Sequence, residues 1–431
     1  MKYLNSFREM KHFLILWSSQ AISSLGSSMT GFALIIWVYE QQGTATSVAL
    51  LSLFTYLPAI LFCFIAGTLA DRWDKKKVML VCDLIAALGT VTVFTLYMTG
   101  RLQIWHLYLV NFLISFMNAF QAPASYVATS LLVPKEHYVR AGGLQAFSGS
   151  VVSIMTPALA TAVLAFAGLR AVFIIDLITF GAAFTTLLFF IKLPPVPAAS
   201  EEAKPGFWQS CTGGLRFLRD HKILLKIILF FAFINLLAYL TGFGIMPAMI
   251  LARTGNDRTI LGMVSTALGL GTLTGSLLVT LMKPPKSRTR TVFLACAVSF
   301  AICNPGWAIG RTVWVWTAAA FAGNLPLPFL NANLTTIMRT KVPIEMQGRV
   351  FAARDTVQYS TVPLGLFLAG FLADYVFEPF MQTGSPFQEA MAFLVGSGKG
   401  AGMALMFLIT GILGCVTSLL SLRDKSYKVL D

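Results

Sequence analysis

The chain reads Gly67-Thr68-Leu69-Ala70-Asp71-Arg72-Trp73-Asp74-Lys75-Lys76-Lys77 between its second and third long apolar runs. An acid followed by a basic cluster is too costly to bury in hydrocarbon. The segment is therefore predicted to be a short aqueous turn between two membrane helices.

The composition supports a membrane protein. The 431 residues are 56% hydrophobic and 12% charged, whereas a soluble domain carries about 25% charged residues. The apolar runs recur along the whole length and reach the roughly 20 residues that a spanning helix needs. Transmembrane strands would alternate and need only about 10 residues. The predicted fold class is therefore an all-α polytopic membrane protein.

The apolar runs predict twelve transmembrane helices in two six-helix bundles. The spans cover residues 13–40, 46–70, 76–99, 104–132, 140–167, 170–191, 222–251, 258–282, 290–310, 313–338, 350–376 and 398–422. Residues 1–191 form the predicted N-terminal bundle, and residues 222–431 form the C-terminal bundle. Between them, residues 192–221 are predicted to be a cytoplasmic linker with an amphipathic surface segment.

The distribution of charge predicts the topology. The net charge is +14, and a cytoplasmic N-terminus places 26 of the 32 Lys and Arg residues on the cytoplasmic side. This bias follows the positive-inside rule and predicts that both termini are cytoplasmic. Because the charge is spread over short loops rather than gathered in one patch, nucleic-acid binding is not expected.

An internal repeat relates the two halves. Val133-Pro134-Lys135-Glu136-His137-Tyr138-Val139-Arg140 and Val342-Pro343-Ile344-Glu345-Met346-Gln347-Gly348-Arg349 share the pattern V-P-x-E-x-x-x-R at an offset of 209 residues. The same offset maps the start of the first span onto the start of the seventh. Duplication of a six-helix unit explains both observations.

Several stretches resemble one transporter family. They are residues 67–77, Leu131-Leu132-Val133-Pro134, Phe173-Ile174-Ile175-Asp176, residues 213–219, Gly348-Arg349-Val350-Phe351 and residues 363–374. Together they resemble the major facilitator superfamily, in particular its drug-efflux branch with the macrolide efflux proteins. The resemblance implies two pseudo-symmetric bundles, alternating access, proton antiport and no enzymatic activity. In the fourth span, Ile114 stands where that family often has an arginine.

The same resemblance implies a cytoplasmic gate. Asp71 would cap the N-terminus of the eleventh span, where a carboxylate is favoured by the helix dipole. The predicted gate residues are Gly67, Asp71, Arg72, Glu136, Arg140, Glu345 and Arg349. The alternative for the three lysines, Lys75 to Lys77, is that they only set the topology.

Polar side chains at helical spacing predict the substrate cavity. They lie in spans 1, 4, 7 and 10, the helices that line the cavity in the family that the chain resembles. The candidates are Gln20, Ser24, Asn111, Ser115, Asn118, Asn235, Tyr239, Asn324 and Asn331. The alternative is that these groups only bind helices to one another. Because no Lys or Arg lies deep in these spans, hydrophobic or amphiphilic substrates are expected rather than phosphorylated ones.

Three acids are candidates for proton coupling: Asp83, Asp355 and Asp176. Ionisable residues within spans are rare and mark transport pathways. The alternative is a structural ion pair, for example of Asp176 with Arg170 or of Asp355 with Arg354.

The remaining expectations concern partners. Gly396-Ser397-Gly398-Lys399-Gly400 lacks the first glycine and the Ser/Thr of a nucleotide-binding loop, so no nucleotide is expected. No metal or cofactor is expected beyond a proton gradient as the driving force. The predicted protein is a monomeric exporter of small hydrophobic molecules in the bacterial inner (plasma) membrane. The alternative is a lipid or lysolipid translocator of the same fold without clear proton coupling.

Overall fold

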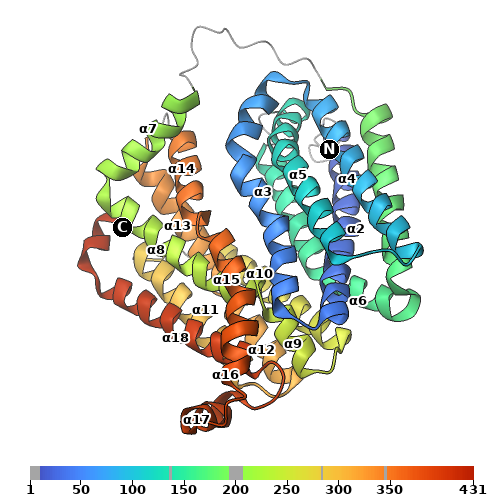
Figure 1. Ribbon diagram of the computed structural model, residues 1–431. Coiled ribbons are helices and arrows are strands. Elements are labelled where there is room, and N and C mark those ends of the chain that lie inside the picture. The colour runs from blue at the N-terminus through green and yellow to red at the C-terminus, as the bar shows by residue number, and fades with distance from the viewer. Residues whose placement is uncertain (1–9, 135–137, 194–206, 283–284, 344–346) are drawn as a thin grey trace. The chain divides into compact units, whose positions relative to one another are not determined.

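The computed structural model describes residues 10–134, 138–193, 207–282, 285–343 and 347–431 (Figure 1). Inside the helices, the side chains of 63–72, 138–140, 207–213 and 347–349, and of residues 130, 143, 146, 280 and 352, lie outside this description. The chain forms two compact units. The N-terminal unit contains Met1–Val38 and Leu51–Glu202, and the C-terminal unit contains Tyr39–Leu50 and Ala203–Asp431.

Long helices account for the N-terminal unit, although residues 39–50, at the end of the first and the start of the second, belong to the C-terminal unit. They are α2 (Lys11–Gln42), α3 (Ala45–Arg72), α4 (Lys75–Met98), α5 (Ile104–Leu132) and α6 (Tyr138–Thr185), followed by a π-helical turn, η2 (Thr186–Phe190). Helix α4 begins where the Asp74 carboxylate accepts a hydrogen bond of 2.9 Å from the backbone of Lys77, as an N-cap residue does. Gly168, at φ 72°, interrupts α6, so that this element contains the fifth and sixth predicted spans.

Small residues let helices of the N-terminal unit pack closely. Ala119, Ala124 and Ala128 of α5 are buried in one cluster with Val78 and Met79 of α4. Alanine faces of this kind let membrane helices approach, and van der Waals contact then holds them together.

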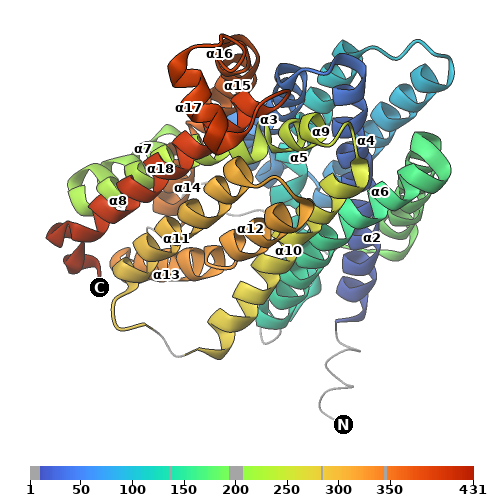
Figure 2. The ribbon, with the colours of Figure 1, turned by 90° about the horizontal axis from the view of Figure 1, so that it is seen from below.

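The C-terminal unit contains more and shorter helices. In chain order they are α7 (Phe207–Asp220), α8 (Lys222–Ala238), η4 (Tyr239–Phe243), α9 (Met246–Arg253), α10 (Arg258–Leu281), α11 (Arg288–Ile309), α12 (Val313–Asn324), α13 (Leu327–Lys341), α14 (Gln347–Tyr359), α15 (Val362–Leu372), η6 (Ala373–Phe377), α16 (Glu378–Phe380), α17 (Pro386–Val395), α18 (Ala401–Arg423) and η7 (Lys425–Leu430). Helix α11 packs beside α12, α13 and α18 (Figure 2).

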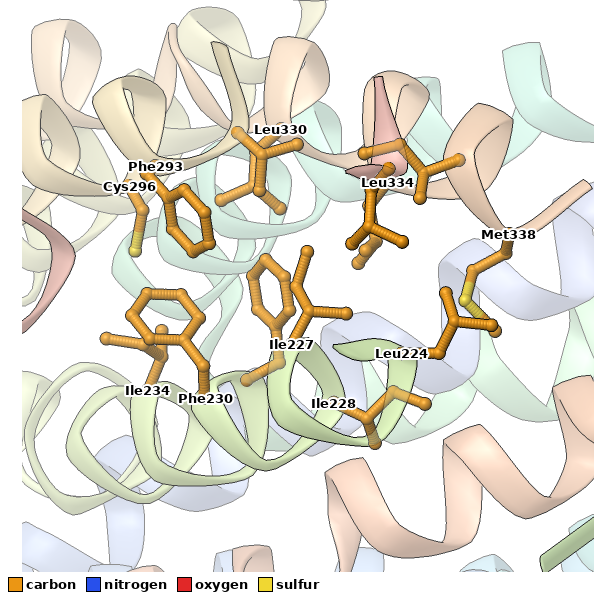
Figure 3. Close-up of a cluster of buried hydrophobic side chains, with 14 of the residues drawn as sticks. Leu224, Ile227, Ile228, Phe230, Ile234, Phe293, Cys296, Leu330, Leu334 and Met338 are labelled. Atoms are coloured by element: carbon orange, nitrogen blue, oxygen red, sulfur yellow. The ribbon is translucent and has the colours of Figure 1, made fainter. Parts of the chain in front are cut away.

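Aromatic and aliphatic side chains fill the core of this unit. Figure 3 shows Ile227 and Phe230 of α8 directed toward Phe293 of α11 and Leu334 of α13. The rings of Phe230 and Phe293 meet edge to face, with centroids 5.0 Å apart, a preferred aromatic arrangement. Helix α8 is thereby fixed against two neighbours.

Glycines of α10 bring it against α12. A Cβ at Gly271 would meet the backbone of Phe321, and one at Gly275 would meet the backbone of Leu325. Glycine at these two positions therefore permits close packing of the two helices.

The membrane-spanning character is confirmed, with differences in detail. Eleven helices in the described residues are long and apolar enough to cross a membrane, and one of them, 44 residues long, contains the Gly168 break and counts as two spans. The predicted span 222–251 is interrupted by the π-helical turn η4, and the span 350–376 breaks between α14 and α15. Helix α17 was not predicted, because its 10 residues are too few to span a membrane.

Candidate functional site

The predicted cytoplasmic gate falls where side chains are not described. Glu136 and Glu345 lie outside the described residues, and the structure describes only the backbone of Gly67, Asp71, Arg72, Arg140 and Arg349, so the roles of all seven stay predictions. The lysines that follow are described. Lys76 Nζ donates to the carbonyl oxygens of Leu188 and Ile191 at 2.8 and 2.7 Å, so this lysine caps a helix C-terminus as well as adding positive charge.

The candidate cavity residues of the N-terminal unit have different surroundings. Gln20 donates to the carboxylate of Asp83. Ser115 is buried and its hydroxyl accepts a hydrogen bond of 3.2 Å from the backbone of Ala59 in α3. Ser24 and Asn118 are exposed, and Asn111 is half-buried. Ser115 therefore connects two helices, whereas Ser24 and Asn118 remain free to face a solute.

In the C-terminal unit, two of the candidate amides bind the backbone. Asn235 Nδ2 donates to the carbonyl of Gln358 in α14 at 3.0 Å, and Asn324 Nδ2 donates to Ala320 within its own helix. The ring of Tyr239 stacks on Phe243 at 4.6 Å, and Asn331 is exposed. The cavity set stays a prediction; of its members in this unit, Asn331 is exposed and Tyr239 is half-buried.

Asp83 is held by two amides from two other helices. Gln121 Nε2 of α5 donates to Oδ1 at 2.5 Å, and Gln20 Nε2 of α2 donates to Oδ2 at 3.4 Å. Asp83 lies eight residues after the start of α4, which places it about 12 Å along the helix. A carboxyl group inside a span thus has neutral hydrogen-bond donors as its partners.

Asp176 has a similar environment nearer the other end of the spans. Ser27 Oγ of α2 donates to Oδ1 at 2.8 Å, and Thr90 Oγ1 of α4 donates to Oδ2 at 3.4 Å. The side chain is buried, and a Cβ at Gly26 would lie 3.1 Å from the Cα of Asp176. Glycine therefore permits the close approach of α2 that brings the hydroxyl to the carboxylate. Arg170, the suggested ion-pair partner, is exposed.

Asp355 differs from the other two acids because it forms an ion pair. Arg354 donates from Nη2 and Nε to Asp355 Oδ1 at 2.7 and 2.9 Å, and 48% of the Asp355 side chain is exposed. The guanidinium also lies 5.1 Å from the ring centroid of Phe351. Asp355 is thus held in an ion pair with its neighbour in the chain.

The carboxylate of Asp374, near the end of the eleventh predicted span, joins α3 to η6. The backbone N–H groups of Ala45 and Thr46 donate to Oδ1 and Oδ2 of Asp374 at 3.1 and 2.7 Å. These are among the first N–H groups of α3, which have no acceptor within the helix. Asp374 therefore caps a helix to which it does not belong. All three residues are in the C-terminal unit.

Two further contacts fasten residues 39–50 within the C-terminal unit. Arg258 forms a bidentate ion pair with Glu40, with N–O distances of 2.6 and 2.7 Å. A Cβ at Gly370 would lie 3.0 Å from the backbone nitrogen of Thr46 and 3.1 Å from the Cβ of Ala49. We call the contacts of Asp374, Gly370 and the Glu40–Arg258 pair the 39–50 clasp.

The sequence contains a signal for this clasp. Gly370-Phe371-Leu372-Ala373-Asp374 and Gly67-Thr68-Leu69-Ala70-Asp71 share the pattern G-x-L-A-D. In the described copy, the aspartate caps a helix N-terminus and the glycine allows close approach. Comparison of the two copies would have identified Asp374 as a capping residue.

Twelve apolar helical segments, buried carboxyl groups and uncharged polar faces define a polytopic membrane protein of the transporter class. The family model of the Major Facilitator Superfamily matches residues 16–366. The chain belongs to the major facilitator superfamily.

Efflux proteins are among the similar sequences. Macrolide efflux protein A of Streptococcus pyogenes is 28% identical over 371 residues, which cover 84% of this chain and 90% of that protein. The multidrug efflux pump Tap of Mycolicibacterium fortuitum is 26% identical over 380 residues, covering 81% and 86%. The resemblance to the drug-efflux branch is thereby confirmed.

Solved structures show the same fold at low identity. The nucleoside transporter NupG gives a TM-score of 0.66 at 14% identity and covers 96% of this chain and 99% of that one. A bacterial homologue of the iron transporter ferroportin, in an inward-facing state, gives 0.66 at 16%, covering 97% and 99%.

Proposed function

We propose that this protein exports hydrophobic or amphiphilic small molecules by alternating access, driven by proton antiport. The observation that carries the proposal is similarity over most of the chain to proteins named for macrolide and multidrug efflux. The proposed location is the bacterial inner (plasma) membrane, with both termini in the cytoplasm and a monomer as the working unit.

The polar faces support an uncharged or amphiphilic substrate. The candidate side chains of α2, α5, α8, α12 and α13 are amides and hydroxyls, and η4 adds one phenol, that of Tyr239. The Lys and Arg residues of these helices lie near their ends, as Lys226 and Arg339 do. A pocket for phosphate or dicarboxylate would need buried guanidinium groups, which hold such anions in a bidentate manner.

The buried acids support a proton as the coupling ion. Asp83 and Asp176 are each held by neutral donors, so either carboxyl group can gain or lose a proton without breaking an ion pair. Protonation is the way in which a carboxyl group within a membrane avoids the cost of carrying charge. The gate residue Asp71 keeps its predicted capping role, which the behaviour of Asp374 in the second G-x-L-A-D sequence supports.

Transport by the full chain in proteoliposomes tests the proposal. Erythromycin, ethidium, a siderophore, a peptide and a fluorescent lysolipid are offered with and without a pH gradient. We expect at least one of the first two compounds to accumulate only with the gradient. Asp257→Asn is the control, because Asn can still cap α10 as Asp257 does. Lysolipid movement without a gradient would instead indicate a lipid translocator, and an absence of flux would overturn the proposal.

A further inference from the structure

Helices α2 and α4 are parallel, and polar residues of α2 lie level with residues of α4 that come 63 positions later in the chain. Gln20 and Asp83 are 63 residues apart, and so are Ser27 and Thr90. Gln20 bonds to Asp83, while Ser27 and Thr90 bond to the same carboxylate, that of Asp176. Equal spacing at two levels places polar side chains of α2 and α4 at matching heights, and we call the row from Gln20 and Asp83 to Ser27 and Thr90 the α2–α4 seam.

The seam runs between two carboxyl groups, of which Asp176 is buried and Asp83 is half-buried. Seven residues separate Gln20 from Ser27 and Asp83 from Thr90, which corresponds to a rise of about 10.5 Å. Ser24 lies between the two levels on the same face of α2, three residues before Ser27. Its partner position on α4 is Ala87, a small buried residue. The exposed hydroxyl group of Ser24 thus lies on α2 at a height between those of the two acids.

The Asp176 end of the seam has a further hydroxyl group. Thr30, one turn beyond Ser27 on α2, is buried, and its hydroxyl group lies within reach of the Asp176 carboxylate. Asp176 is therefore surrounded by three hydroxyl groups, those of Ser27, Thr30 and Thr90.

Neither Asp83 nor Asp176 forms an ion pair within the part of the chain that the structure describes. Among the described residues, the ion pairs involve Asp424, Glu40 and Asp355, not Asp83 or Asp176. The groups facing the two acids are Gln20, Ser27 and Thr30 from α2, Thr90 from α4, Gln121 from α5 and Thr179 of α6 itself. The titratable Cys82 thiol lies next to Asp83 in α4.

We propose that Asp83 and Asp176 are the two ends of one proton relay inside the N-terminal unit. This inference rests on the proposed function. A proton enters at one carboxylate, and the neutral acid at the other end releases its proton. Between them, each hydroxyl or water accepts one proton and donates another, so that the number of protons is conserved. The relay runs along the α2–α4 seam, and its far end at Asp176 lies between α2, α4 and α6.

Infrared difference spectroscopy of the purified full chain tests the relay without any substrate. The carbonyl stretch of protonated carboxyl groups is followed as the pH is stepped, in the wild type, Asp83→Asn, Asp176→Asn and the double variant. Two charges about 10 Å apart in a medium of intermediate dielectric shift each other's titration by about one pH unit. Each single variant should therefore lose one band and change the midpoint of the other. Two bands that titrate independently would refute the relay.

Transport measurements distinguish failure of the relay from failure of the proposed function. In Asp83→Asn and in Asp176→Asn, we expect accumulation driven by a pH gradient to fall at least ten-fold. Exchange of erythromycin or ethidium in the absence of a gradient should remain, which shows that the variants fold. Asp176→Glu should restore part of the driven transport. The relay is wrong if the single variants keep full driven accumulation or if a sodium gradient replaces the pH gradient. Absence of driven transport in the wild type would instead refute the proposed function.

Discussion

Replacement of Asp374 by alanine should loosen the first turn of α3 and little else. The carboxylate accepts hydrogen bonds from the backbone of Ala45 and Thr46 at 3.1 and 2.7 Å. Removal of a capping side chain costs about 0.5–2 kcal/mol. Since 1.4 kcal/mol is a factor of ten in an equilibrium constant, local opening at these two amides should become about 2- to 30-fold more frequent.

Amide hydrogen exchange measured by mass spectrometry checks this expectation in the purified protein. Exchange should accelerate in peptides that contain residues 44–47 and stay unchanged in the rest of the C-terminal unit, because local opening is confined to the element that loses its cap.

Helix α10 offers a matched control. Asp257 caps it by accepting from the backbone of Thr259 and Ile260 at 2.8 and 3.3 Å. Asp257→Ala should accelerate exchange at residues 258–261 and leave residues 44–47 unchanged. If Asp374→Ala leaves the exchange of Ala45 and Thr46 at the wild-type rate, Asp374 does not cap α3 and the 39–50 clasp is wrongly assigned.

Three further predictions concern other parts of the chain. Gly370→Ala should lower stability by about 1–3 kcal/mol through overpacking against Thr46, measured by thermal unfolding in detergent, whereas Gly242→Ala, with open space around it, should not. Lys226 lowers the pKa of Asp424 from 3.8 to about 2. The ion pair between them should therefore break only as the pH falls from about 4 toward 2, and a spin label at position 429, in the η7 helix that follows Asp424, should gain mobility over that range. An Asp424→Asn variant that retains this pH dependence would contradict the assignment. Asp71→Asn should abolish transport but preserve substrate binding, and normal efflux by that variant would count against the gate.

Apolar length predicted the spans well, because a membrane demands a minimum run of hydrophobic residues whatever the neighbouring helices are. It could not predict where a span breaks. The interruption at η4 and the end of α14 at Tyr359 depend on packing, and Pro363 alone does not fix the break before it. The Pro326 and Pro328 positions, which the sequence does mark, coincide with the boundary between α12 and α13.

For the candidate site as well, the sequence predicted which residues lie within spans but not which residues contact one another. Sequence spacing placed Gln20 and Asp83 within spans, but it could not pair them, because pairing depends on which helices are neighbours. The preference of Asp176 for Ser27 and Thr90 over the nearby Arg170 has the same origin. The pairing of Asp355 with Arg354 was accessible because the two residues are adjacent in the chain.

The assignment of Tyr39–Leu50 to the C-terminal unit has a consequence for how the polypeptide is connected. The backbone passes from one unit to the other three times, after Val38, after Leu50 and after Glu202. Cleavage within residues 192–221 cuts the third connection, and the other two lie inside the N-terminal fragment, so the non-covalent contacts of residues 39–50 would join the two fragments. Nicked protein should therefore elute as one particle from a sizing column. Co-expressed fragments divided at this linker should associate through residues 39–50.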